Sequence, residues 1–274
     1  MKDNFVFFGT PEPAVIVLEQ LKKVGLFPTH IVTNPDRPAG RGLAMQASPA
    51  KIWGEENIIP VLTPEKMDGN FIKNLEEINP ALCIVVAYGK ILKKEILDIP
   101  EKGFLNVHPS LLPLHRGATP IQSCILSGDK ETGVTVMQLD EKMDHGPIVA
   151  QEFLELQGNE LSPDLHKKLF EIGGDLLAEA IPEYIAGNID LQDQDDELAT
   201  YAEKIEKKDG EILESDTDEI KWQKYRAYYG WPGVFYFNND RRVKISSARF
   251  EKEKFIIERI IPEGKKEQEY KKSA

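Results

Sequence analysis

Short runs of β-branched and aromatic residues alternate with helical patterns in the first part of the chain. FVFF precedes AVIVLEQLKKV, THIVT follows, and ALCIVV comes before ILKKEIL. Such alternation predicts a mostly parallel sheet with helices on both faces. The continuous apolar run ALCIVVAYG is typical of a strand that is covered on both sides. The pattern therefore predicts an α/β fold with a Rossmann-like sheet.

The pattern changes towards the C-terminus. FLNV, GVTVMQL and PIVAQEFLEL predict further strands, PIQSCILSG a helix, and residues 162–185 a long helix. The polar, charged stretch that follows is typical of a linker. Beyond it, TDEIKWQKYRAYYG predicts a helix, and FYFNNDRRVKISSARF with KFIIERI predicts short antiparallel strands. We expect a first domain over 1–189, a linker over 190–203 and a small β domain over 204–274.

Charge is distributed unevenly along the 274 residues, whose net charge is −12. Residues 1–200 hold 17 Lys+Arg against 31 Asp+Glu, whereas residues 201–274 hold 17 against 15. The overall charge opposes long-range attraction to a polyanion. If the protein contacts a nucleic acid, the C-terminal part is the better candidate.

The chain carries no apolar run of about 18 residues and no signal-peptide pattern at its start, so we expect neither a membrane span nor secretion. Its two cysteines, Cys83 and Cys124, lie far apart and outside any CxxC pattern. They indicate neither a disulfide framework nor a thiolate zinc site. These features favour a cytoplasmic protein.

Asn106 and His108 form the first candidate site. They are two residues apart at the end of an apolar run, so on a strand both side chains lie on one face while Val107 lies on the other. Ligands of open α/β sheets bind at the carboxyl ends of strands. Asp144 sits in a glycine-containing turn; if it meets His108, its carboxylate would favour the imidazolium form and orient the ring.

Other kinds of chemistry have weaker support. FFGTPEPAV offers only Gly9, whereas the dinucleotide fingerprint needs three spaced glycines. A nucleophilic Ser110 or Cys124 lacks a GxSxG elbow. A metal site built from histidines and Asp144 lacks a recognisable ligand spacing, so we expect no metal.

A set of motifs resembles the methionyl-tRNA formyltransferases of the folate-dependent formyltransferase family. The motifs are FFGTP, NPDRPAGRG, VVAYGKIL, NVHPSLLPLHRGATPIQ, ETGVTVMQLDEKMDHGPIV, YAEKIEKKDGEI and WPGVF, in that order over about the first 235 residues. The NxHxSLLPxxRG stretch and the MDxG turn are shared by the wider family. NPDRPAGRG and YAEKI point to the branch that uses tRNA.

The resemblance implies a role for particular residues. The catalytic trio falls on Asn106, His108 and Asp144. The folate-binding positions fall on two segments: Ser110, Leu111, Leu112 and Pro113, and Ala87, Tyr88, Gly89 and Ile91. The NPDRPAGRG loop resembles one that approaches the tRNA acceptor end. Its two arginines, Arg41 and Arg37, the latter directly before Pro38, are therefore candidate contacts with the tRNA.

The resemblance implies transfer of a formyl group from 10-formyltetrahydrofolate to the α-amine of initiator methionyl-tRNA. The sequence does not determine the oligomeric state; a monomer is favoured, and no metal is expected. In the expected reaction Asn106 and a protonated His108 donate hydrogen bonds to the developing oxyanion, and Asp144 orients His108. The alternatives are a sugar N-formyltransferase acting on an amino-deoxysugar nucleotide, a 10-formyltetrahydrofolate hydrolase, and a folate- or RNA-binding module without activity.

The chain departs from the family pattern in two places. Leu43 and Ala44 stand where the family commonly has basic residues after GRG, and the C-terminal segment is short for the family's OB-like barrel. Basic residues remain in the C-terminal segment, at Arg241, Arg242, Lys265, Lys266, Lys271 and Lys272. We therefore expect a shortened OB-like domain and tRNA binding that is weak and salt-sensitive.

Overall fold

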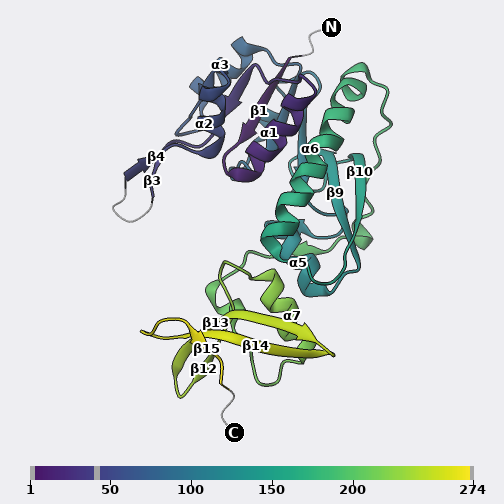
Figure 1. Cartoon of the computed structure of the whole chain (residues 1–274). Helices are drawn as coiled ribbons and strands as arrows, with labels where there is room; N and C mark the ends of the chain where they lie inside the picture. Colours follow the sequence, from purple (N-terminus) through teal and green to yellow (C-terminus); the bar gives the residue numbers. More distant parts are fainter. Residues whose placement is uncertain (1–3, 40–43, 272–274) are drawn as a thin grey trace. The chain divides into compact units, whose positions relative to one another are not determined.

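The computed structural model describes residues 4–39 and 44–271. Contacts divide the chain into two compact units, which are described separately (Figure 1). The first comprises residues 1–116, 133–153 and 167–200, and the second 117–132, 154–166 and 201–274. The linear partition at 190–203 remains a proposal, because this grouping follows contacts and not chain order.

The first unit is built on a seven-stranded sheet. In spatial order its strands are β10 (Ile148–Glu155), β9 (Glu131–Gln138), β7 (Phe104–His108), β6 (Leu82–Val86), β1 (Phe5–Gly9), β2 (His30–Val32) and β5 (Val61–Leu62). Parallel pairing joins β7 through β5, and β7 pairs antiparallel with β9. The predicted mostly parallel sheet is confirmed.

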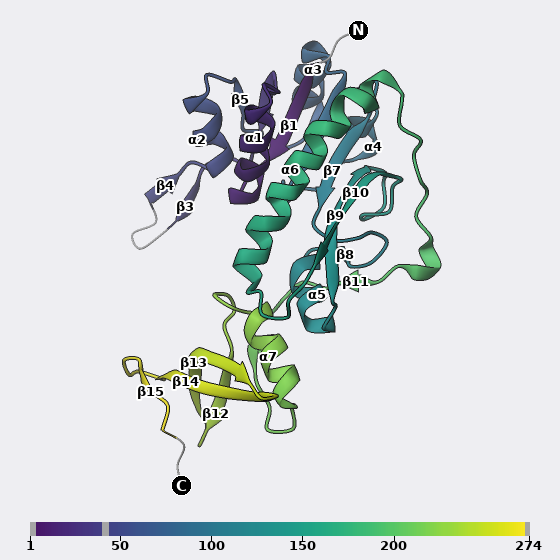
Figure 2. The same cartoon turned by 45° about the vertical axis from the view of Figure 1, so that its right-hand side comes forward.

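Helices cover both faces of this sheet, as the pattern predicts (Figure 2). They are α1 (Glu12–Lys23), α2 (Pro49–Glu56), α3 (Gly69–Ile78), α4 (Lys94–Leu97) and α6 (Ser162–Ala186). Phe71 and Leu75 of α3 pack with Val6 and Phe8 of β1. Gly173 of α6 approaches the side chains of the other face, so closely that a Cβ there would collide with Val107 and Val134.

Local sequence explains where several helices begin and end. Ser48 and Asp68 accept hydrogen bonds from the first turns of α2 and α3, two helices that periodicity alone did not reveal. The helix predicted at ILKKEIL is only four residues long, since Lys93 is extended and Pro100 follows closely. No helix in the described ranges is long and apolar enough to cross a membrane.

The second unit contains α5 (Pro120–Ser127), α7 (Asp218–Ala227) and a four-stranded sheet. Its strands are β12 (Phe235–Asn238), β13 (Arg241–Glu251), β14 (Lys254–Pro262) and β15 (Gln268–Glu269), each antiparallel to its neighbour. Trp222 of α7 stacks on Phe250, with ring centroids 5.9 Å apart. The predicted helix and antiparallel strands of the C-terminal region are confirmed.

The remaining elements are short. They are the strands β3 (Arg37–Ala39), β4 (Ala44–Gln46), β8 (Arg116–Gly117) and β11 (Tyr201–Ala202), and the 3-10 helices η1 (Asp196–Leu198) and η2 (Lys207–Gly210). β3, in the NPDRPAGRG segment, pairs antiparallel with β4, which follows that segment, and the two strands are called the β3–β4 hairpin.

Candidate active site

Strand β7 places an amide and an imidazole side by side. Asn106 and His108 alternate with Val107 along β7, which pairs with β6 through Val85 and Asn106. The side chain of Asn106 is half-buried and makes no hydrogen bond within the described part of the chain, so its amide is available to a substrate. His108 is only 4% exposed, so its ring is held within the unit.

The ring of His108 has a partner at each nitrogen. Nε2 lies 3.0 Å from the carbonyl oxygen of His115, and Nδ1 lies 3.8 Å from Oδ2 of Asp144. Because a carbonyl only accepts hydrogen bonds, Nε2 carries a hydrogen and donates it. Nδ1 is therefore the nitrogen that gains or loses a proton, and it faces the carboxylate of Asp144. The predicted meeting of His108 and Asp144 is present.

Burial changes the resting charge of this histidine. Desolvation lowers the pKa of His108 below its usual value, while the nearby negative charge of Asp144 and the hydrogen bond to His115 act in the opposite direction. The net shift is downward, so the ring is neutral at pH 7 before substrate binds. The predicted donation from a protonated His108 to the oxyanion is not tested by this shift and stays a prediction.

The SLLP segment is fixed by backbone contacts. The Ser110 hydroxyl donates to the Leu114 carbonyl at 2.6 Å, and Thr135 Oγ1 donates to the Ser110 carbonyl at 2.7 Å. Thr135 Oγ1 also accepts from the backbone N–H of Leu112 at 3.1 Å. The Ser110 side chain is buried and its hydroxyl is engaged, which argues against a serine nucleophile. Leu111 and Pro113 are half-buried.

The other predicted folate segment is a tight turn after β6. Ala87 has φ +48° and Gly89 has φ +79°, so the backbone is left-handed at both positions. The Tyr88 ring packs against Phe8, with centroids 5.5 Å apart, and its carbonyl accepts a 2.9 Å hydrogen bond from Asn34. The turn is thus fixed, while Ile91 is 91% exposed and available for contact.

A cavity of 410 Å³ lies in the first unit, between the α4 region and the segment that leads to the Asp144 loop. Leu97 and Leu139 supply apolar walls, and Gln138, Asp140 and Glu141 supply polar ones. The eight predicted folate positions do not line this cavity. They remain predictions.

Of the two predicted tRNA contacts, Arg37 lies on β3 of the β3–β4 hairpin. Arg37 is exposed in β3, and Asp36 before it forms an ion pair with Lys51 at 2.8 Å. The pKa of Lys90, in the turn after β6, is lowered by desolvation and then by the positive charge of Arg37. Arg37 therefore adds positive charge near that turn. Arg41 lies outside the described residues.

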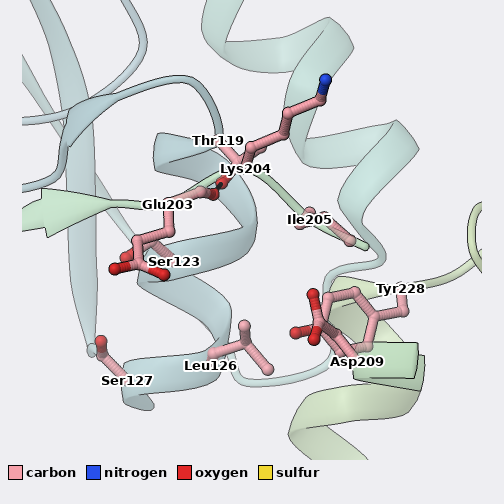
Figure 3. Close-up of a pocket in the computed structure, with 9 residues that line it drawn as sticks. All are labelled: Thr119, Ser123, Leu126, Ser127, Glu203, Lys204, Ile205, Asp209 and Tyr228. Carbon is pink, nitrogen blue, oxygen red and sulfur yellow. Dashed lines mark hydrogen bonds between the residues drawn. The ribbon is translucent and has the colours of Figure 1, made fainter. Parts of the chain in front are cut away.

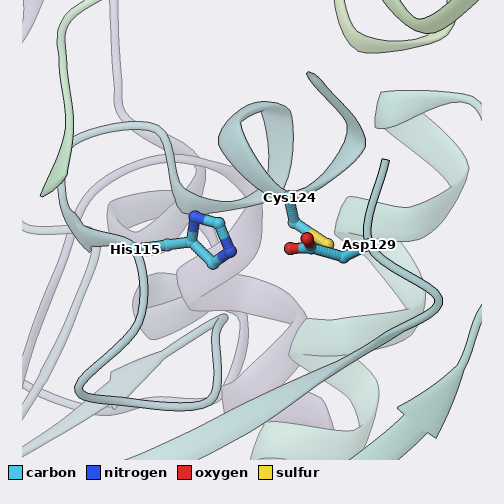
Figure 4. A group of neighbouring side chains, drawn as sticks. All are labelled: His115, Cys124 and Asp129. Atoms are coloured by element: carbon cyan, nitrogen blue, oxygen red, sulfur yellow. The ribbon is translucent and has the colours of Figure 1, made fainter. Parts of the chain in front are cut away.

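The other candidate nucleophile, Cys124, is a buried free cysteine. Burial raises the pKa of its thiol to about 12, so the thiol stays protonated near neutral pH. Figure 4 draws Cys124 with Asp129 and His115. His115 belongs to the first unit and the other two to the second, so we assign no metal site to them.

The second unit has a cavity of its own, of 370 Å³ (Figure 3). Serines of α5 line it together with Glu203, Lys204 and Ile205 of the YAEKI motif. The Thr119 hydroxyl donates a hydrogen bond to the Glu203 carbonyl. The motif that pointed to the tRNA-using branch therefore packs beside α5.

Sequence analysis missed two residues that shape the site. Arg116 is 2% exposed and donates to Gln194, which in turn donates to the Asp144 loop. Arg116 stands inside the NVHPSLLPLHRG motif but was given no role. Gln194 lies in a polar stretch whose composition is typical of a linker, and the residues around it carry no local signal of a role in the site.

Comparisons with known proteins identify the family of the chain. Residues 3–181 match the formyl transferase family. The chain is 40% identical over 246 residues to a methionyl-tRNA formyltransferase from Chloroflexus aggregans and 43% identical to one from Thermodesulfovibrio yellowstonii. Each match covers 89% of this chain and 80% of the relative.

Solved structures share the fold. The methionyl-tRNA formyltransferase from Clostridium thermocellum has a TM-score of 0.63 at 19% identity, covering 94% of this chain and 98% of that one. The N-formyltransferase from Helicobacter canadensis, solved with folinic acid and dTDP-3-aminofucose, has a TM-score of 0.69 at 20% identity, covering 90% and 88%. Family match, close relatives and fold agree: the chain belongs to the methionyl-tRNA formyltransferases of the formyl transferase family.

Proposed function

We propose that the protein transfers the formyl group of 10-formyltetrahydrofolate to the α-amine of initiator methionyl-tRNA. The observation that carries the chemistry is the group at the end of β7, where His108 Nδ1 faces the Asp144 carboxylate at 3.8 Å and Asn106 shares the strand. The acceptor follows from relatives about 40% identical that are named methionyl-tRNA formyltransferases. The enzyme acts as a cytoplasmic monomer in this proposal.

The reaction begins when the neutral amine attacks the formyl carbon. A C–N bond forms and the carbonyl oxygen gains negative charge. The Asn106 amide, whose side chain makes no hydrogen bond to any described residue, donates to that oxygen. One such donor commonly stabilises a transition state by about 3 kcal/mol. The folate N10–C bond then breaks, and tetrahydrofolate leaves.

The proton that the amine loses needs an acceptor, and the His108–Asp144 pair supplies it. His108 is neutral at rest because burial lowers its pKa. A proton added at Nδ1 is held between the ring and the carboxylate of Asp144, while Nε2 keeps its hydrogen bond to the His115 carbonyl. The pair then returns the proton to the folate N10 as that bond breaks. No covalent enzyme intermediate is needed.

The test is a direct assay of both substrates. Purified protein is mixed with 10-formyltetrahydrofolate and either charged initiator methionyl-tRNA or a panel of amino-sugar nucleotides, and tetrahydrofolate release is followed. We expect formylated methionyl-tRNA and tetrahydrofolate in equal amounts. Transfer to a sugar alone would overturn the acceptor, and tetrahydrofolate release without any acceptor would indicate a hydrolase.

A further inference from the structure

The polar stretch before residue 200 contacts the loop that carries Asp144. The side-chain amide of Gln194 donates two hydrogen bonds from Nε2, one to the Asp144 carbonyl at 2.9 Å and one to the Gly146 carbonyl at 2.7 Å. All three residues belong to the first unit. A single amide therefore bridges two carbonyls, one on each side of the turn.

Arg116 fixes the orientation of that amide. Its Nε and Nη2 atoms donate to Gln194 Oε1 at 3.0 and 2.8 Å. A guanidinium group only donates, so the oxygen of the amide must point to Arg116 and the nitrogen to the loop. Arg116 is 2% exposed, which leaves its side chain little freedom to move. Nη2 also pairs with Asp196 at 2.8 Å.

A second contact joins the same stretch to the loop. Asp196 Oδ2 lies 3.3 Å from His145 Nε2, and His145 Nδ1 lies 2.6 Å from Asp140 Oδ2. The pKa of Asp196 is lowered, first by its hydrogen bond with Arg116, so its carboxylate stays charged. Arg116 thus reaches the loop by two routes, one through Gln194 and one through Asp196.

The conformation of the loop requires such support. Asp144 has φ +50°, a left-handed backbone that non-glycine residues adopt at a cost. A Cβ on Gly146 would collide with the Gln138 carbonyl oxygen, so the backbone of the loop lies close to the strand before it. Asp144 Oδ2 lies 3.8 Å from His108 Nδ1, and a shift of the loop by about 1 Å would remove the alignment of the carboxylate with the ring.

We propose that Gln194 is a positioning residue, oriented by Arg116, that holds the Asp144 loop at its working distance from His108. The proposal rests on the function proposed above, since it concerns the same site. The stretch between the last long helix and the C-terminal module then helps to position a loop of the site, in addition to linking two parts of the chain.

Two substitutions of Gln194 distinguish a residue that positions the Asp144 loop from one that only attaches the polar stretch to Arg116. In Gln194→Ala both the contact with Arg116 and the contact with the loop are lost. In Gln194→Glu the carboxylate still pairs with Arg116 but has no N–H for the two carbonyls. If Gln194 positions the loop, both variants lose turnover. If Gln194 only attaches the polar stretch to Arg116, the Gln194→Glu variant keeps its turnover.

The measurements are kcat and KM for formyl transfer, the melting temperature, and amide hydrogen exchange of residues 140–146. We expect kcat to fall about 10- to 100-fold in both variants, with KM for the folate changed less than about threefold. Exchange should accelerate in residues 140–146, while Gln194→Glu melts within about 3 °C of the parent. Gln192→Ala, with an exposed side chain two residues earlier, is the matched control and should leave all readings unchanged.

Three results would overturn the proposal. They are a Gln194→Glu variant with near-parent kcat, a rate loss without faster exchange in residues 140–146, and faster exchange spread evenly over the protein. If the parent protein transfers no formyl group to any acceptor, the proposed function fails instead. The exchange comparison would then still show whether Gln194 holds the loop.

Discussion

The carboxyl end of β7 and the β3–β4 hairpin belong to the same unit but differ in the burial of their side chains and in the number of contacts that restrain them. His108 is 4% exposed and has a partner at each ring nitrogen. Arg37 is exposed on a strand of three residues that, within the described ranges, pairs with β4 alone. Groups that react must be held in position beforehand, whereas a group that meets a large substrate gains its partner on binding.

The difference also determines how each region responds to its surroundings. At β7, exclusion of water lowers the pKa of His108 and strengthens its interaction with Asp144. At the hairpin, salt screens the charge of Arg37, because the side chain stands in solvent. Substitutions at β7 should therefore affect kcat, and substitutions in the hairpin should affect the KM for tRNA and its salt dependence.

The largest effect is expected from Asp144→Asn. A neutral amide cannot stabilise the protonated His108 ring as the carboxylate does, so we expect kcat to fall about 100- to 10,000-fold. Folate affinity, measured by fluorescence titration, should change less than about threefold. Glu76→Gln, an exposed change on α3, is the control. A variant with near-normal kcat would remove Asp144 from the mechanism.

The fold was predictable from the sequence because its signals are local. β1 and β6 are continuous apolar runs, and α6 spans Ser162–Ala186 against a predicted 162–185. His108 could be placed on one face with Asn106, since strand periodicity is two. These inferences need only neighbours along the chain.

The support of the Asp144 loop was not predictable, because it depends on residues distant in sequence. Gln194 lies 50 positions after Asp144 and 78 after Arg116. Nothing near Gln194 distinguishes it from the other polar residues of a solvated linker. The lowered pKa of His108 also depends on burial by the tertiary fold, which the tripeptide around it cannot reveal.

A second prediction concerns pH. If neutral His108 accepts the proton, kcat/KM should be level near pH 7 and fall as pH drops through the His108 pKa, below the usual 6.5. Histidine NMR should show the same midpoint, and Asp144→Asn should lower it further, since the carboxylate raises the pKa. A midpoint above 6.5 would contradict a neutral resting histidine.

The lowered pKa of His108 also makes the free energy of unfolding depend on pH. The unfolded chain binds a proton at His108 more readily than the folded one does, so the free energy of unfolding decreases as pH falls from 6.5 towards the folded pKa. Burial also lowers the pKa of His30 and His166, which act in the same direction. Denaturant unfolding at pH 7.5 and 5.5 should show the lower stability at pH 5.5.

The hairpin should give a smaller effect with a different character. Arg37→Ala removes one exposed charge, and we expect KM for methionyl-tRNA to rise about three- to tenfold with kcat nearly unchanged. The slope of log affinity against log salt should become shallower by about one. Lys73→Ala, an exposed change on α3, is the control. If kcat falls and KM does not, the hairpin belongs to the chemistry and the comparison with β7 fails.

The smallest effect is expected at the base of the hairpin. Lys51 of α2 donates to both carboxylate oxygens of Asp36, at 3.0 and 2.8 Å, and both side chains are partly exposed. An ion pair so open to solvent stabilises by at most about 1 kcal/mol. Asp36→Asn should therefore lower the melting temperature by less than about 3 °C and raise KM for methionyl-tRNA about twofold. A loss of kcat comparable to that of Asp144→Asn would show that the hairpin is held as firmly as β7.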